Sequence, residues 1–123
     1  MVEVVEHMLK TRQGVEAVST TPDDRRDDIR NRIAAAVRRV DGGQGVLILT
    51  DMLGDTQTNL SVEVARETGA EVLAGINVPI LVKMMGVRET MDAHALAAFL
   101  RSYGKDHIFW ATEPRERRDS TAP

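Results

Sequence analysis

The sequence contains no cysteine, which excludes disulfides, thiol catalysis and cysteine-ligated metals. Aromatic residues make up only 3% of it, so we expect no platform that stacks bases or sugars. The formal net charge of -3 gives no nucleic-acid footprint and no bias towards a membrane surface. No apolar run approaches the length of a membrane span, and the first residues lack the pattern of a signal peptide. We therefore expect a cytoplasmic protein that binds no nucleic acid and does not insert into a membrane.

What the chain does contain is typical of one soluble domain. Its 123 residues are 42% hydrophobic and 28% charged, which suffices for a single core. Residues 113–123 are charged and carry no apolar anchor, so we expect a domain over residues 1–112 and a mobile tail over 113–123. The sequence shows no metal-ligand spacing and no nucleotide loop of the P-loop or Rossmann kind, and we expect no cofactor.

The hydrophobic periodicity predicts strands that alternate with helices. Helices are expected over residues 2–10, 22–40, 59–68, 80–85 and 91–103, and strands over residues 15–19, 46–49, 71–76 and 107–111. Thr21 is expected to cap the second helix, and Gly104 to end the last one. This alternation predicts an α/β fold with a mainly parallel sheet, helices on both faces and a short edge strand at the C-terminus.

The most informative strand is Val46–Leu49, because its apolar run does not alternate with polar residues. That pattern is typical of a parallel strand that helices cover on both faces. Asp51 follows at its carboxyl end, where open α/β sheets place their ligand crevice. An aspartate there can also simply shape the next turn, so both interpretations of Asp51 stand.

Three stretches of the sequence resemble one known family: Val15–Val18, Gly45–Met52 and Val72–Leu81. They are similar to the enzyme IIA domain of the mannose/fructose type of the bacterial sugar phosphotransferase system (PTS). The similarity runs in register from about Val5 to Ile108. The segment Gly75-Ile76-Asn77-Val78-Pro79 is part of that match, and doubly wound folds in general do not share it.

The resemblance implies a flavodoxin-like three-layer sandwich and a homodimer. It also implies that a histidine accepts a phosphoryl group from the carrier protein HPr and passes it to a IIB domain. Asp51 would orient that histidine through its second ring nitrogen. A loop would receive the phosphate oxygens, and the family motif places it at Met52, Gly54, Asp55, Thr56 and Asn59.

The resemblance leaves simpler roles open for several of these residues. Thr56 and Asn59 are also suited to be a loop hydroxyl and a helix N-cap. Asn77 and Pro79 would lie in a turn at the same crevice, where they can equally shape the turn without touching a ligand.

The chain departs from the family at its start, because it begins within what is the family's first helix. The opening strand and its histidine turn have no counterpart here. His7 falls in that helix, while His94 and His107 lie near the C-terminus. In a strand order of 2-1-3-4, residues 15–19 and 46–49 would then lie two strand spacings apart, about 9.6 Å. Three explanations for the missing strand are open. Either the protein starts upstream, or the sheet rearranges, or another chain supplies the strand.

The loop departs from the family pattern as well. The family usually has Gly-Gly-Thr/Ser-Pro-x-Asn at this position. Asp55 replaces a glycine and Gln57 replaces a proline. If Asp55 faces the crevice, its carboxylate about 4 Å from a phosphoryl oxygen costs roughly 1 kcal/mol in water, and about 4 kcal/mol at an effective dielectric near 20. If it faces solvent, it has little effect.

Three hypotheses of function follow from the resemblance and its departures. The first is a PTS IIA protein that carries phosphate or regulates sugar uptake. The second is a degenerate IIA-like binding or regulatory module without phosphotransfer, which the missing histidine and Asp55 favour. The third is the phosphotransferase subunit that serves dihydroxyacetone kinase, which shares the architecture. In each case the strand expected over residues 107–111 is a candidate to pair at a sheet edge with a partner subunit.

Overall fold

The computed structural model describes residues 14–114. The elements follow the order α2 (Arg26–Val40), β1 (Leu47–Leu49), α3 (Thr56–Thr68), β2 (Glu71–Leu73), α4 (Val78–Val87), the 3-10 helix η1 (Arg88–Thr90) and α5 (Ala93–Asp106). The helix expected over residues 2–10, which includes His7, lies outside the described residues. So does most of the tail expected over residues 113–123.

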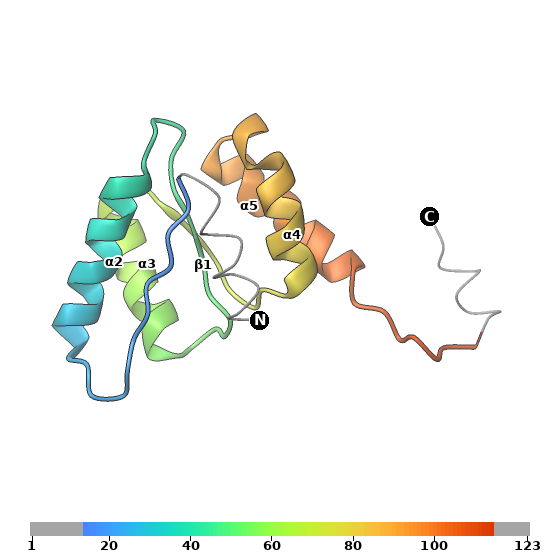
Figure 1. Cartoon of the computed structure of the whole chain (residues 1–123), viewed down its shortest axis with the longest axis horizontal. Helices are drawn as coiled ribbons and strands as arrows, with labels where there is room; N and C mark the ends of the chain where they lie inside the picture. Colours follow the sequence, from blue (N-terminus) through green and yellow to red (C-terminus); the bar gives the residue numbers. More distant parts are fainter. Residues whose placement is uncertain (1–13, 115–123) are drawn as a thin grey trace.

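A small parallel sheet forms the middle layer of the fold. Leu47, Ile48 and Leu49 of β1 lie opposite Glu71, Val72 and Leu73 of β2. Helices α2 and α3 lie on one side of the sheet, and α4 and α5 lie on the other (Figure 1). The predicted α/β fold with helices on both faces is therefore confirmed. Within residues 14–114 the sheet contains only these two strands.

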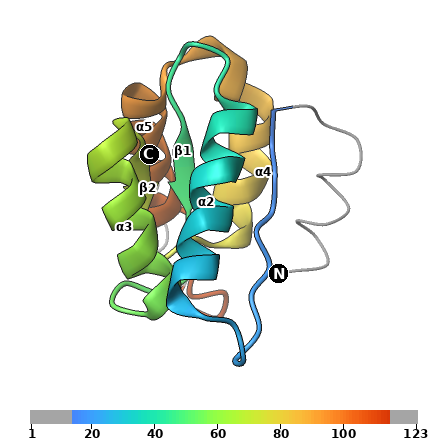
Figure 2. The same ribbon diagram turned by 90° about the vertical axis from the view of Figure 1, so that its left-hand side faces the viewer.

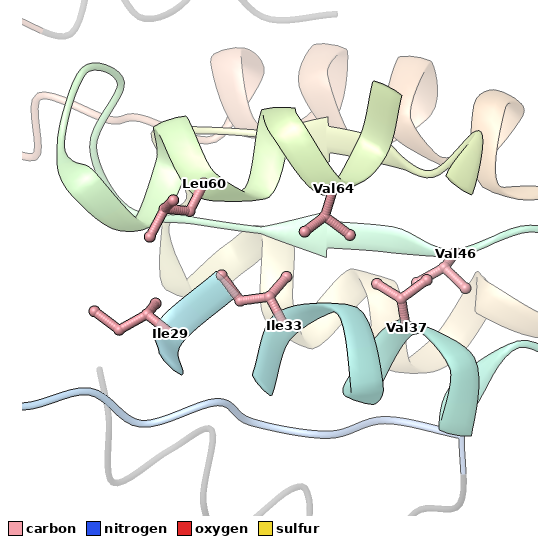
Figure 3. Close-up of a cluster of buried hydrophobic side chains, with 6 residues drawn as sticks. All are labelled: Ile29, Ile33, Val37, Val46, Leu60 and Val64. Atoms are coloured by element: carbon pink, nitrogen blue, oxygen red, sulfur yellow. The ribbon is translucent and has the colours of Figure 1, made fainter. Parts of the chain in front are cut away.

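The first apolar cluster fills the space between the sheet and the α2–α3 layer. Ile29, Ile33 and Val37 project from α2 at helical spacing, as the sequence predicts. Figure 3 shows them facing Val46, Leu60 and Val64. On the outside of this layer, Arg26 and Glu63 form an ion pair at 3.2 Å between α2 and α3.

The second apolar cluster lies between the other face of the sheet and the α4–α5 layer. Its buried members are Ile80, Leu96 and Leu100. Leu100 has no solvent exposure at all. Leu47 of β1 packs against this second cluster, whereas its neighbour Ile48 packs against the first. Alternation along β1 therefore sends successive side chains into opposite cores, which explains why the strand is apolar throughout.

Residues 15–19 do not form the strand predicted for them. They run instead along α2 (Figure 2), where Arg32 donates to the Ser19 carbonyl at 2.8 Å and Arg39 Nε donates to the Glu16 carboxylate at 3.1 Å. A strand needs a neighbouring strand for its backbone hydrogen bonds. In the described part of the chain, β1 pairs only with β2, and no backbone bond joins it to residues 15–19.

The helix predicted to begin at Pro22 begins later, at Arg26. The Thr21 N–H donates to the Asp24 carboxylate at 2.7 Å, and the Asp24 N–H donates back to the Thr21 carbonyl at 3.1 Å. These bonds close a turn before the helix. Thr21 is therefore not the helix cap, and that prediction is wrong.

Side-chain caps explain two other helix starts for which the predicted position is wrong. Asp55 caps α3, so this helix starts before Asn59, and Asn59 is a helical residue rather than the N-cap. Asn77 caps α4, so this helix starts at Val78 and continues to Val87, beyond the predicted 80–85. β2 ends at Leu73, short of the predicted residue 76.

The sequence predicted that the last helix ends at Gly104, and this prediction is wrong. Asp92 caps it, and it runs through Gly104 to Asp106. Gly104 is buried because α4 packs directly against it there. This glycine has a helical backbone and serves a close helix–helix contact, so the pattern of a C-terminal stop was misleading.

The C-terminal edge strand predicted over residues 107–111 is not present. After α5 this segment projects away from the helices (Figure 1). Ile108 and Phe109 are each 76% exposed, and Trp110 is 57% exposed. Apolar residues with high β propensity do not form a strand without a sheet edge beside them, and no other strand of the described chain pairs with them.

Two surface carboxylates make the stability depend on pH in the acidic range. The hydrogen bond from Arg39 lowers the pKa of Glu16, and the hydrogen bond from Arg32 lowers the pKa of Asp24. Because the folded-state pKa is lowered, each stabilising contribution is present above the ordinary carboxyl pKa of about 4. Each contribution is lost as the pH falls through the lower folded-state pKa.

We therefore expect Glu16→Gln to be less stable than the wild type at pH 6, by a small amount because the pair is solvent-exposed. The difference should disappear once the pH has fallen through the lowered folded-state pKa of Glu16. Urea denaturation at pH 6 and across the acidic range measures it. Arg39→Gln removes the same hydrogen bond from the other side and should show the same pH dependence. A difference that persists unchanged at acidic pH would contradict the assignment to this ion pair.

Candidate functional site

The candidate site lies at the carboxyl end of the two strands. Asp51 follows β1 and is exposed. The Thr50 N–H donates to the Leu73 carbonyl at 3.0 Å, and the Ile76 N–H donates to the Thr50 carbonyl at 3.2 Å. These bonds hold the ends of β1 and β2 together. The structure thus places Asp51 at the edge where a parallel sheet presents a ligand; its role there stays a prediction.

A buried threonine holds the loop that follows Asp51. Thr58 has no solvent exposure. Its hydroxyl lies 2.6 Å from the Met52 carbonyl oxygen and 2.9 Å from the Thr50 hydroxyl. Because a hydroxyl has one proton, the Thr58 hydroxyl donates to the Met52 carbonyl and accepts from Thr50. The apolar pattern of the sequence did not predict that Thr50 and Thr58 anchor this loop. The signal for such an anchor is a pair of hydroxyls, one at the end of the strand and one in the first turn of the helix.

The Asp55 side chain folds back onto the start of α3. Its carboxylate accepts a hydrogen bond from the Thr58 N–H at 2.7 Å and caps α3. Its φ is -77°, so the left-handed backbone of the loop falls on Gly54, with φ of 93°. Replacing the family's glycine by aspartate therefore needs no backbone strain. It places a carboxylate at the positive end of the α3 dipole.

The other predicted loop residues are mostly exposed. Met52 is 63% exposed, and its neighbour Leu53 is 80% exposed. Thr56 is the first residue of α3 and is also exposed. Asn59 lies one turn into the helix, where its amide donates to the Gly54 carbonyl at 3.4 Å. Gln57 is turned towards the Thr20 hydroxyl, to which it donates at 2.9 Å.

Asn77 and Pro79 have clear structural roles in the neighbouring turn. The Asn77 side-chain oxygen accepts from the Ile80 N–H at 3.0 Å, and its amide nitrogen donates to the Gly104 carbonyl at 3.3 Å. Pro79 stands in the first turn of α4, where the missing N–H costs nothing. Asn77 therefore connects the start of α4 to the end of α5.

We expect Asn77→Ala to lower the free energy of unfolding by about 1–2 kcal/mol, because it removes a helix cap and a second, half-buried hydrogen bond. Urea denaturation measures this. Asn31→Ala, at an exposed position on α2, is the matched control and should change stability by less than about 0.5 kcal/mol. Equal effects of the two substitutions would show that the Asn77 contacts contribute nothing.

The two histidines of the described chain lie at opposite ends of the sheet. His94 Nδ1 is 3.2 Å from the carboxylate of Glu71, the first residue of β2, so it lies at the edge away from Asp51. His107 follows α5, its Nδ1 is 2.7 Å from the Tyr103 carbonyl oxygen, and its ring stacks on the Tyr103 ring at 3.7 Å. Neither histidine has a hydrogen bond to Asp51 among the described contacts.

Within the described residues, no group of three or more His, Asp or Glu side chains is arranged to hold a metal ion. None of the described helices combines the length and the apolarity that crossing a membrane requires. The arrangement that remains is an exposed carboxylate beside a hydroxyl-anchored loop and a helix N-terminus. That arrangement is typical of open α/β domains, which bind ligands at the carboxyl edge of a parallel sheet.

Comparison with known proteins assigns the family. A family model described as the PTS system fructose IIA component matches residues 1–100. The chain belongs to this family. It is 33% identical over 59 residues to the candidate phosphotransferase enzyme IIA component YadI of Escherichia coli (strain K12). That match covers 47% of this chain and only 40% of the relative's length.

A solved structure shows the same fold. The phosphotransferase system component EIIA from Streptococcus agalactiae is similar with a TM-score of 0.73. The similarity covers 91% of this chain and 90% of that one, at 19% sequence identity. It agrees with the flavodoxin-like architecture expected from the sequence.

Proposed function

We propose that this protein works in the cytoplasm as a PTS IIA-type phosphoryl carrier or regulator, between HPr and a IIB domain. The supporting observation is the exposed carboxylate of Asp51 at the carboxyl end of β1, in a chain of the IIA family. In the transfer, the phosphorus–nitrogen bond of phosphorylated HPr breaks as a new one forms to an imidazole of the acceptor. By the resemblance, Asp51 would hold the histidine of the family's opening turn, which has no counterpart in this sequence, in the tautomer whose free nitrogen attacks.

The surrounding residues would serve the same step. Backbone amides at Gly54 and Thr56 are suited to bind phosphoryl oxygens, with the Thr56 hydroxyl beside them. Met52 and Asn59 shape the loop through the contacts described above. Asn77 and Pro79 border the crevice from the β2 side.

The test is a phosphorylation assay on the purified chain with phosphoenolpyruvate, enzyme I and HPr, with the intact mass measured before and after. We expect one acid-labile phosphoryl group, and peptide mapping then identifies the acceptor histidine. Asp51→Asn should slow the transfer at least tenfold, because the amide favours the wrong tautomer. Asp41→Asn, exposed at the other end of β1, is the matched control. No mass gain would end the carrier hypothesis.

One observation favours the second hypothesis, a binding or regulatory module that carries no phosphate. The Asp55 carboxylate already occupies the first turn of α3. Under this hypothesis the purified chain gains no phosphoryl group, yet it still binds HPr or a IIB domain. Calorimetric titration with unphosphorylated HPr distinguishes such a module from a carrier that is merely inactive.

We also propose a homodimer in which residues 107–111 pair with the partner's sheet edge. Three adjacent large apolar residues, Ile108, Phe109 and Trp110, are exposed in this segment, which is unusual for a surface without a partner. Analytical ultracentrifugation should show a dimer for the wild type and a monomer for Phe109→Ser/Trp110→Ser. Leu53→Ser, equally exposed in the site loop, should remain dimeric. A monomeric wild type would refute the proposal.

A further inference from the structure

Helix α4 has an apolar face that the two apolar clusters do not bury. Ile80, Met84 and Val87 project towards the sheet and α5, in the second apolar cluster. On the opposite side of the helix, Val78 and Val82 lie one turn apart and are 38% and 57% exposed. A helix that is apolar all round is normally covered on all sides. This side of α4 is therefore a surface that a further segment can cover.

Two more residues complete this surface, the second face of α4, which consists of Val78, Leu81, Val82 and Met85. Met85 follows Val78 by about two turns and is half-buried. Leu81 is only 4% exposed, although it belongs to neither apolar cluster. Part of the second face is thus covered by residues outside both clusters, while Val82 remains open to solvent.

The end of the described chain indicates which segment lies near this face. The described residues begin at Gly14, and a Cβ on Gly14 would lie 3.2 Å from Arg88 Nη1. Arg88 directly follows α4. Residues 1–13, which lie outside the described residues, therefore join the described chain beside the side chain that follows the last turn of α4.

The sequence of residues 2–10 matches the second face in character and in length. Val2, Val5 and Leu9 recur at helical spacing, with charged residues between them. A helix over residues 2–10 would be about 13.5 Å long, against about 15 Å for the 10 residues of α4. Residues 11–13 span up to about 10 Å when extended, which suffices to connect such a helix to the described chain.

We propose that residues 2–10 form an amphipathic helix that docks on the second face of α4 and shields Val82 from solvent. The two helices run in the same direction, because the segment ends next to Gly14, which lies beside Arg88. This direction places Val5 near Val82, at the middle of both helices. The inference goes beyond the proposed function and does not depend on phosphotransfer.

Introduced cysteines test this contact, because the chain contains none of its own. Val5→Cys/Val82→Cys places two thiols on the proposed contact. His7→Cys/Val82→Cys is the matched control, because position 7 lies on the opposite face of a helix from position 5. A disulfide needs Cα atoms about 4.4–6.8 Å apart, so the first pair should close at least about tenfold faster than the control under mild oxidation.

Peptide mapping under non-reducing conditions, with the intact mass, measures both rates. Equal rates in the two pairs would overturn the inference. A covalent dimer as the main product would overturn it as well, because a second copy of the chain would then occupy the second face.

Thiol labelling of Val82→Cys alone tests the shielding without a cross-link. Adding Val5→Ser/Leu9→Ser makes the proposed contact polar and should raise the labelling rate at least about threefold, because labelling follows the open fraction. Arg101→Cys, exposed on α5, is the control and should label equally fast with and without the two serines. An unchanged rate at Val82→Cys contradicts the docking, and so does an equal rise at both cysteines, since the effect would not be local.

Discussion

Replacement of Leu100 by alanine should lower the free energy of unfolding by about 3–4 kcal/mol, within the range measured for buried leucines. Leu100 has no solvent exposure and packs with Ile80 and Leu96 in the second apolar cluster. The loss combines the transfer free energy of the removed carbons with the cavity that α4 and the sheet cannot fully close. Loss on this scale is a large fraction of the stability of a domain of this size.

Urea denaturation followed by circular dichroism measures this change. Leu53→Ala is the matched control, because Leu53 is 80% exposed and its replacement should change the stability by less than about 0.5 kcal/mol. If Leu100→Ala cost no more than Leu53→Ala, the α4–α5 layer would not pack on the sheet as described.

Gly104→Ala should lower the free energy of unfolding by about 1–3 kcal/mol, although alanine is the better helix former. A Cβ at this position would lie 2.7 Å from Ile80 Cγ1, and closer still to Ile80 Cδ1. Ile80 is buried and cannot turn away without leaving the cluster. The two helices must separate, or Ile80 must adopt an unfavourable rotamer.

Gly86→Ala, at the other helical glycine of the α4–α5 layer, should change the free energy of unfolding in the opposite direction. Gly86 lies in α4, and a Cβ there meets nothing within 4 Å. Its replacement should raise the free energy of unfolding by up to about 1 kcal/mol through helix propensity alone. Thermal unfolding of both variants gives the comparison. Two changes of the same sign would contradict the close contact at Gly104.

The sequence predicted the order of the elements from α2 to α5, because burial on a helix or strand leaves a periodic apolar pattern. Ile29, Ile33 and Val37 repeat at helical spacing and are buried in α2. The uninterrupted apolar run at Val46–Leu49 correctly indicated a strand with both faces covered. The position of Asp51 at the end of that strand follows from the same pattern.

The predictions that failed depend on what a segment meets in three dimensions. Residues 15–19 and 107–111 have the composition of strands, but strand formation needs an adjacent edge that the composition does not reveal. Gly104 was interpreted as a stop because glycine commonly ends helices, whereas its role is to admit Ile80. Only the contact with the other helix distinguishes these two uses of glycine.

The sequence predicts that Asp51 follows the central strand, but it does not predict the contacts within the loop that comes next. Two residues of similar chemistry, Asp55 and Asn59, both suit a helix N-cap, and the sequence did not indicate which one caps α3. The anchoring of the loop by Thr58 was missed because a threonine in a helix usually points to solvent or to its own backbone. The burial of Thr58 follows only from the folded loop that covers it.

The separation of the two apolar clusters implies that the site is shared between two cooperative units. The loop after Asp51 is anchored through Thr58 to α3, in the first layer, whereas Asn77 is anchored through Gly104 to α5, in the second. Between residues 14 and 114, the sheet that joins these layers consists of the three-residue strands β1 and β2. Amide hydrogen exchange in α3 and in α5 should therefore proceed through separate openings. A binding partner that contacts both layers would slow amide hydrogen exchange in both α3 and α5.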